Sequence, residues 1–86
     1  MTKIKLTYPI TVDGAKLNEI TLRRPTVKDM RVARVTGGKD DATQEINLIA
    51  NLAQITTEAV ESLDMADFVK VQKALAGFFG LSETTP

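Results

Sequence analysis

Alternating apolar and polar side chains at the start of the chain predict a half-buried β-strand. The apolar positions recur at every second residue and are separated mainly by lysines and threonines, which is the pattern expected when one face of a strand packs against a core. These positions are Ile4, Leu6, Tyr8 and Ile10. The Asp13-Gly14 pair is typical of a turn, and residues 17–22 supply the apolar side chains of a returning strand.

The two strands can pair in more than one register, and their apolar faces distinguish the alternatives. A two-residue turn would place Leu6 opposite Thr21, which mixes an apolar face with a polar one. A three-residue loop over residues 12–14, with Gly14 in the left-handed conformation of a bulge, places Leu6 opposite Ile20. We therefore predict the three-residue loop.

A first helix is predicted over residues 26–35 because its start carries a capping pattern. Thr26 followed three residues later by Asp29 resembles a capping box, and the glycine pair at positions 37 and 38 ends the helix. The side chains expected to face inward are Val27, Met30 and Ala33. Those expected to face outward are Lys28, Arg31 and Arg34.

The longest stretch without a charge, residues 46–57, predicts a helix over about 42–55 at the centre of the core. Its polar side chains form one stripe at spacings of three and four, so the helix should be covered on more than one side. The stripe consists of Gln44, Asn47, Asn51 and Gln54. It has two interpretations: an exposed edge of the helix, which we favour, or a hydrogen-bonded seam against a neighbouring helix.

Two further helices are predicted over residues 57–63 and 65–79, with Asp64 capping the second and Gly80 ending it. Apolar residues cover about half of the circumference of the last helix, more than the ~100° stripe that docking on one core requires. We therefore expect part of this helix to bind a partner. The candidate side chains are Val71, Leu75, Phe78 and Phe79. The alternative, that they belong to the core, stays open.

These elements predict an α+β fold, in which a β-hairpin over residues 3–23 precedes a bundle of three or four helices. All of them are assigned to one domain, residues 1–81, and residues 82–86 to a flexible tail. A domain of this length buries a modest core, so oligomerisation or a partner would add to its stability.

The composition excludes several kinds of catalytic and metal site. The 86 residues include no Cys and no His, which removes thiolate nucleophiles, imidazole bases, disulfides and the usual zinc ligands. Four carboxylates at spacings of three are interpreted as a solvated acidic face, not as an acid pair or a hard-metal site. They are Glu58, Glu61, Asp64 and Asp67. We assign no catalytic residue, metal ligand or cofactor, and expect no enzyme.

Charge is distributed unevenly, although the formal net charge is zero. Residues 23–39 contain six basic side chains and one acidic one, whereas residues 40–86 contain two basic and eight acidic. The basic side chains assigned to partner binding are Arg24, Lys28, Arg31 and Arg34. Nucleic acid is disfavoured as the partner, because no aromatic residue is interleaved with them. We expect an acidic protein surface instead, including that of a second copy, and hence a homo-oligomer.

The hydropathy of the chain predicts no membrane contact. No apolar run approaches the roughly 20 residues of a membrane-spanning helix. The first residues also lack the apolar block of a signal peptide. The chain is therefore expected in the cytoplasm.

Several short motifs follow one another along nearly the whole chain. They are Tyr-Pro-Ile in the first strand, a Val-Asp-Gly turn, Arg-Arg-Pro-Thr-Val-Lys-Asp, a Gly-Gly pair, Leu-Asp-Met-Ala-Asp-Phe and a final Ala-Leu-Ala-Gly-Phe-Phe. In this order they resemble the small tail assembly chaperones of Mu-like and related contractile-tailed phages and prophages. The resemblance is strongest over residues 22–29 and 63–68.

The resemblance implies a non-enzymatic protein of the host cytoplasm that binds the tape measure protein and keeps it soluble until the tail tube polymerises around it. Such chaperones are absent from the finished virion. Further partners that it implies are the tail tube protein and a longer form of the chain itself, made by ribosomal frameshifting. Two alternatives stay open: a small DNA-binding regulator that uses the basic strip from Arg23 to Arg34, and a structural subunit of the tail.

Overall fold

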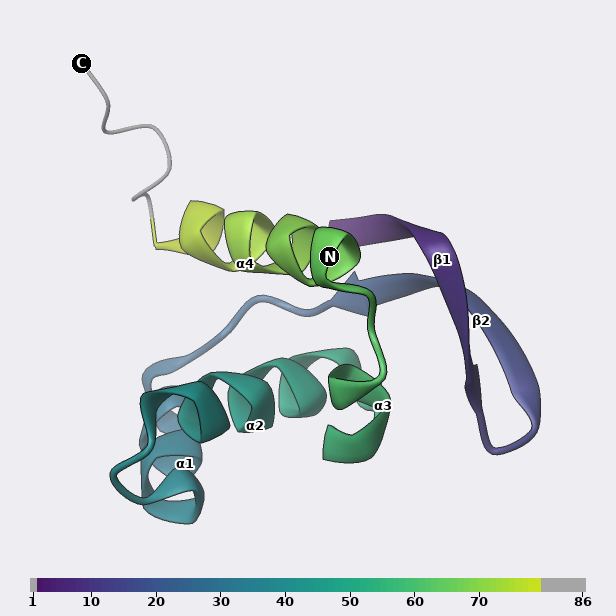
Figure 1. Cartoon of the computed structure of the whole chain (residues 1–86). Coiled ribbons are helices and arrows are strands. Elements are labelled where there is room, and N and C mark those ends of the chain that lie inside the picture. Colours follow the sequence, from purple (N-terminus) through teal and green to yellow (C-terminus); the bar gives the residue numbers. More distant parts are fainter. Residues whose placement is uncertain (1, 80–86) are drawn as a thin grey trace.

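Two antiparallel strands followed by four helices make up residues 2–79, the part of the chain that the computed structural model describes (Figure 1). The predicted α+β fold, with the hairpin first, is confirmed. The elements are β1 (Thr2–Val12), β2 (Ala15–Leu22), α1 (Val27–Gly37), α2 (Asp41–Ala53), α3 (Thr57–Glu61) and α4 (Met65–Phe78). The predicted helix end at Gly80 and the predicted tail over residues 82–86 lie outside the described residues.

The hairpin turns through two residues, so the predicted three-residue loop is wrong. Asp13 and Gly14 both have positive φ, 51° and 79°, and Val12 pairs directly with Ala15. An Asp-Gly pair readily adopts positive φ at both central positions, and the resulting turn matches the twist of the flanking strands. The turn chemistry therefore decides the register next to the turn.

The apolar faces are brought back into line by an irregularity in β1. Ile10 pairs with Leu17 near the turn, but farther along Lys5 pairs with Glu19 and Ile4 with Ile20. Residues 6–9 of β1 therefore lie opposite Asn18 alone. The predicted pairing of Leu6 with Ile20 is wrong, yet both side chains are buried. The extra residues of β1 bend away from the ladder, as a large bulge does.

The core lies around α2, whose apolar circumference is covered from several sides. Ile49 and Leu52 of α2 are almost completely buried. The helix packs against α1, α3 and β2, whereas the closest packing of α4 is against β1 (Figure 1). Helix α4 therefore closes the core from the hairpin side.

Three of the four residues in the amide stripe of α2 form hydrogen bonds along α1, as in the seam interpretation that we did not favour, although Asn51 is also exposed. The bonds join Asn47 to the Thr36 hydroxyl (3.0 Å), Asn51 to the Asp29 carboxylate (3.2 Å), and Gln44 to the carbonyl of Gly38. Gln54 is exposed and ends α2 in the left-handed conformation. The amides therefore fix how α1 lies on α2.

Helix α1 presents a different face to the core from the one predicted. Asp29 and Ala33 are buried, whereas Val27 and Met30 are exposed. Gly37 continues the buried stripe at the same spacing of four, and a Cβ at this position would come within 2.8 Å of the Gln44 backbone. Because Gly37 contacts α2 closely and Asp29 faces inward, Val27 and Met30 are left in solvent.

Candidate protein-interaction surface

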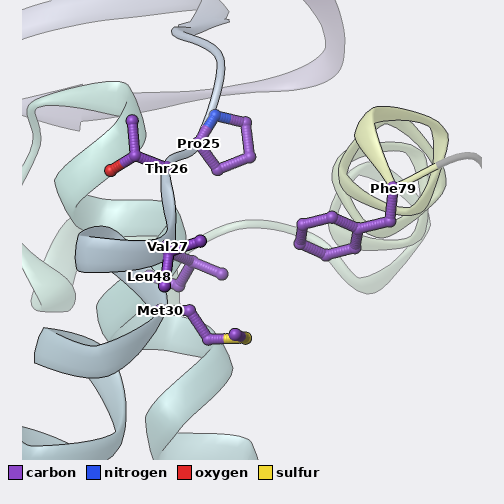
Figure 2. A pocket seen from close by; sticks show the side chains of 6 residues that line it. All are labelled: Pro25, Thr26, Val27, Met30, Leu48 and Phe79. Atoms are coloured by element: carbon purple, nitrogen blue, oxygen red, sulfur yellow. The ribbon is translucent and has the colours of Figure 1, made fainter.

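An apolar hollow lies between the start of α1 and the end of α4. Its volume is about 330 Å³ and its lining is almost entirely apolar. Figure 2 shows the ring of Phe79 extending from the end of α4 toward Val27 and Met30. The lining residues are Pro25, Thr26, Val27, Met30, Leu48 and Phe79. We call this site the Phe79 hollow.

The apolar side chains around the Phe79 hollow are unusually accessible for their type. Val27 is 79% exposed, Phe79 49% and Met30 40%. Single exposed apolar residues are common on soluble proteins, but neighbouring ones around a concavity mark a site of interaction. The three side chains come from two helices that are far apart in sequence, so the fold assembles this surface.

Basic side chains border the same region. Arg24 is exposed, and its guanidinium carbon lies 5.9 Å from the centre of the Phe78 ring, within the range of a cation–π contact. Lys28 follows Val27 on α1 and is exposed. Arg34 lines an adjoining hollow of about 220 Å³ that shares Met30 with the first and also contains Asp41 and Glu45. The apolar centre is thus bordered by Arg24 and Lys28 near the start of α1 and by charges of both signs beside Arg34.

The start of α1 is held in place by an ion pair and a capping box. Arg23 donates to both carboxylate oxygens of Asp29, at 2.7 and 2.9 Å. The backbone N–H of Thr26 also donates to Asp29 at 2.8 Å, and the Thr26 hydroxyl accepts from the Asp29 N–H. The hydrogen bond from Arg23, followed by that from Thr26, holds the pKa of the Asp29 carboxyl well below its usual value. Pro25 and Val27 are thereby fixed at the edge of the hollow.

The position of α4 depends on Asp67, which is fully buried. The backbone N–H groups of Thr7 and Tyr8, in the irregular part of β1, each donate to one of its carboxylate oxygens at 2.9 Å. Lys70 adds an ion pair at 3.2 Å. Burial alone would raise the pKa of Asp67, but the two N–H donors and Lys70 outweigh it and lower the pKa.

The Asp67 contacts correct the predicted acidic face. Glu58, Glu61 and Asp64 are exposed as expected, but Asp67 is not part of a solvated surface. Its carboxylate replaces the strand partner that β1 lacks over its irregular part. It joins α4 to the hairpin and thereby helps to position the helix that carries Phe79.

The eight predicted partner-binding residues divide into three groups by exposure. Val71 and Leu75 are buried in the core, so their predicted exposure is wrong. Phe78 is half-buried beneath Arg24. The remaining five side chains are exposed around the hollow or on α1: Phe79, Arg24, Lys28, Arg31 and Arg34.

Sequence reasoning missed Val27 and Met30. We assigned both to the core because they share a helical face with Ala33. The capping box indicates instead that Val27 faces solvent. Its Asp29 also accepts hydrogen bonds from Arg23, and when the Asp29 side chain faces the core, Val27 faces solvent.

Residues 2–79 contain neither a metal-ligand cluster nor a helix that could cross a membrane. Within residues 2–79 no group of three or more potential ligating side chains could bind a metal ion. Over the same range, every helix is too short or too polar to span a membrane.

A known protein family matches most of the chain. A family model described as phage tail assembly chaperone proteins, E, or 41 or 14, matches residues 3–80 of the chain. The match includes nearly all of both strands, all four helices and every residue that lines the Phe79 hollow. No curated protein and no solved structure matches.

Proposed function

Because the chain belongs to this family of phage tail assembly chaperones, we propose that it binds the tape measure protein in the host cytoplasm and keeps it soluble until the tail tube polymerises around it. The observation that supports this proposal is the Phe79 hollow with its accessible apolar side chains. A chaperone of an aggregation-prone client needs apolar surface that stays available in its own folded state. Its role is non-enzymatic, as the family suggests.

The hollow suits apolar side chains projecting from a client helix. A volume of about 330 Å³ lies at the small end of the range for ligand pockets, ≈ 300–1,000 Å³. It is therefore suited to individual side chains, while the body of the helix rests on the edge. Helix recognition in a groove uses apolar anchors at spacings of three and four. Arg24 and Lys28 at the edge favour a client helix with acidic residues beside those anchors.

The hollow stays open because its two sides are anchored separately. Arg23 and Asp29 fix the start of α1, and Asp67 binds α4 to β1. These contacts hold the backbones of α1 and α4 that carry Val27 and Phe79. Each hollow binds the client weakly, and several copies along one long client multiply the affinity.

Co-expression tests this function. The tape measure protein encoded beside this chain should be largely insoluble when produced alone, and several-fold more of it should be soluble when the chain is co-expressed. The two proteins should also co-purify. An unchanged soluble fraction would contradict the proposal, and so would recovery of the chain from purified particles, which would make it a structural subunit of the tail.

A further inference from the structure

The outer face of α1 carries a second apolar area, separate from the Phe79 hollow. Val35 is 77% exposed and Val32 is about half exposed. Both lie beside Lys28 and Arg31, and together with Thr36 these side chains line a shallow hollow of about 260 Å³. We call this area the basic face. It is apolar at its centre and positively charged around it.

An area of opposite charge lies where α3 leads into α4. Met65 is 68% exposed and lines a shallow hollow of about 190 Å³ together with Glu61 and apolar side chains of α2, α3 and α4. Glu58 and Asp64 are exposed on the same stretch of chain. We call this area the acidic face. Its centre is again apolar, and the charges around it are negative.

We propose that the basic face of one copy binds the acidic face of a second copy, head to tail. Figure 1 shows α1 and α3 at opposite ends of α2, so the two faces of one molecule cannot meet each other. Two basic faces repel, as do two acidic faces, so symmetric pairing through either face alone is disfavoured. A second copy of this chain supplies, for each face, a face of opposite charge with an exposed apolar centre.

A head-to-tail contact leaves one free face at each end of a pair. Such contacts build rings when the rotation between copies closes, and open arrays when it does not. The Phe79 hollow shares no lining residue with the basic face, so the contact does not use the side chains that line it. An assembly would present several hollows to one client, although the contact itself does not depend on the client.

Charge reversal tests the contact without the client. Arg31→Glu and Glu61→Arg each change an exposed side chain of one face. In sedimentation velocity over a range of protein concentrations at low salt, each change alone should raise the dissociation constant of self-association about tenfold. In the double variant the dissociation constant should return to near the wild-type value. The acidic side chain at position 31 of one copy then faces the basic side chain at position 61 of the next, so the attraction is restored.

Two controls separate this contact from general effects of charge. Lys16→Glu reverses an exposed charge near the hairpin turn and should leave self-association unchanged. Wild-type association should weaken with salt, since the screening length falls from about 10 Å at 0.1 M to about 3 Å at 1 M. Val35→Ser removes apolar area without changing charge and should also weaken association.

Three results would overturn the proposal. The first is a wild-type protein that stays monomeric at every concentration at low salt. The second is single variants that associate as the wild type does, and the third is a double variant as weak as the single ones. None of these three results tests client binding, which the co-expression experiment measures separately. The two proposals can therefore fail independently.

Discussion

Replacing Asp67 with alanine should lower the midpoint of thermal unfolding by roughly 10 °C or more at neutral pH. The change removes the carboxylate that accepts hydrogen bonds from the N–H groups of Thr7 and Tyr8, which lie in the irregular part of β1. It also removes the ion-pair partner of Lys70, which keeps its hydrogen bonds to Thr7 and Lys5. Partly buried donors that lose a charged acceptor carry a desolvation cost, so the contact between α4 and the hairpin should weaken. Circular dichroism during heating measures the effect.

Glu61→Ala is the matched control for Asp67→Ala. Both changes remove one carboxylate from the acidic half of the chain, but Glu61 is exposed, and exposed substitutions usually change stability little. Asp67→Asn should recover part of the loss, because an amide oxygen can still accept one of the two N–H groups. If Asp67→Ala unfolds at the same temperature as Glu61→Ala, the buried contact does not stabilise the fold.

The same carboxylate predicts how stability depends on pH. The pKa of Asp67 is lowered in the folded state, so its contribution is present above the unfolded-state value of about 4 and is lost as the pH falls through the folded value. Asp29 contributes with the same sign. Wild-type stability should therefore fall below about pH 4, and Asp67→Ala should show a shallower fall.

Converting the Phe79 hollow to a polar surface should abolish solubilisation of the tape measure protein and leave the chaperone folded. The double variant Val27→Ser with Phe79→Ser removes two accessible apolar side chains from its lining. Truncating central apolar anchors removes most of the binding energy of an interface. The soluble fraction of the co-expressed client should fall to the level seen without the chaperone.

A second double variant controls for the loss of exposed apolar area. Tyr8→Ser with Val69→Ser also replaces one aromatic and one valine, both accessible to solvent and neither lining the hollow. It should solubilise the client as the wild type does. Equal losses in both variants would mean that apolar surface in general, and not this hollow, binds the client. Val71 does not suit such a test, because it is fully buried.

The features that the sequence predicted correctly depend on signals within a few residues. The capping box of Thr26 and Asp29, the cap at Asp64 and the C-cap at Gly38 all mark helix ends through contacts at spacings of two to four. The order of a hairpin followed by helices follows from such signals. Periodicity likewise identified α2 as the helix at the centre of the core.

The features that were predicted wrongly from the sequence depend on polar contacts between distant parts of the chain. The register of β1 changes where its N–H groups bind Asp67, which lies about sixty positions away. We grouped Asp67 with the exposed acidic residues because it follows Asp64 at the same spacing of three. The neighbouring sequence does not distinguish Asp67 from Asp64. The rotation of α1, and with it the exposure of Val27, likewise depends on Asn51 and the Asp29 contacts.

Photo-crosslinking tests most directly whether the client binds at the Phe79 hollow. A photoreactive phenylalanine analogue replaces either Phe79 or Tyr8 in cells that also produce the tape measure protein. Both positions carry accessible aromatic rings, but only Phe79 lines the hollow. If the client binds at the Phe79 hollow, position 79 should crosslink to the tape measure protein and position 8 should give little or no crosslink. Crosslinks from position 8 alone, or equal yields from both, would contradict binding at the Phe79 hollow.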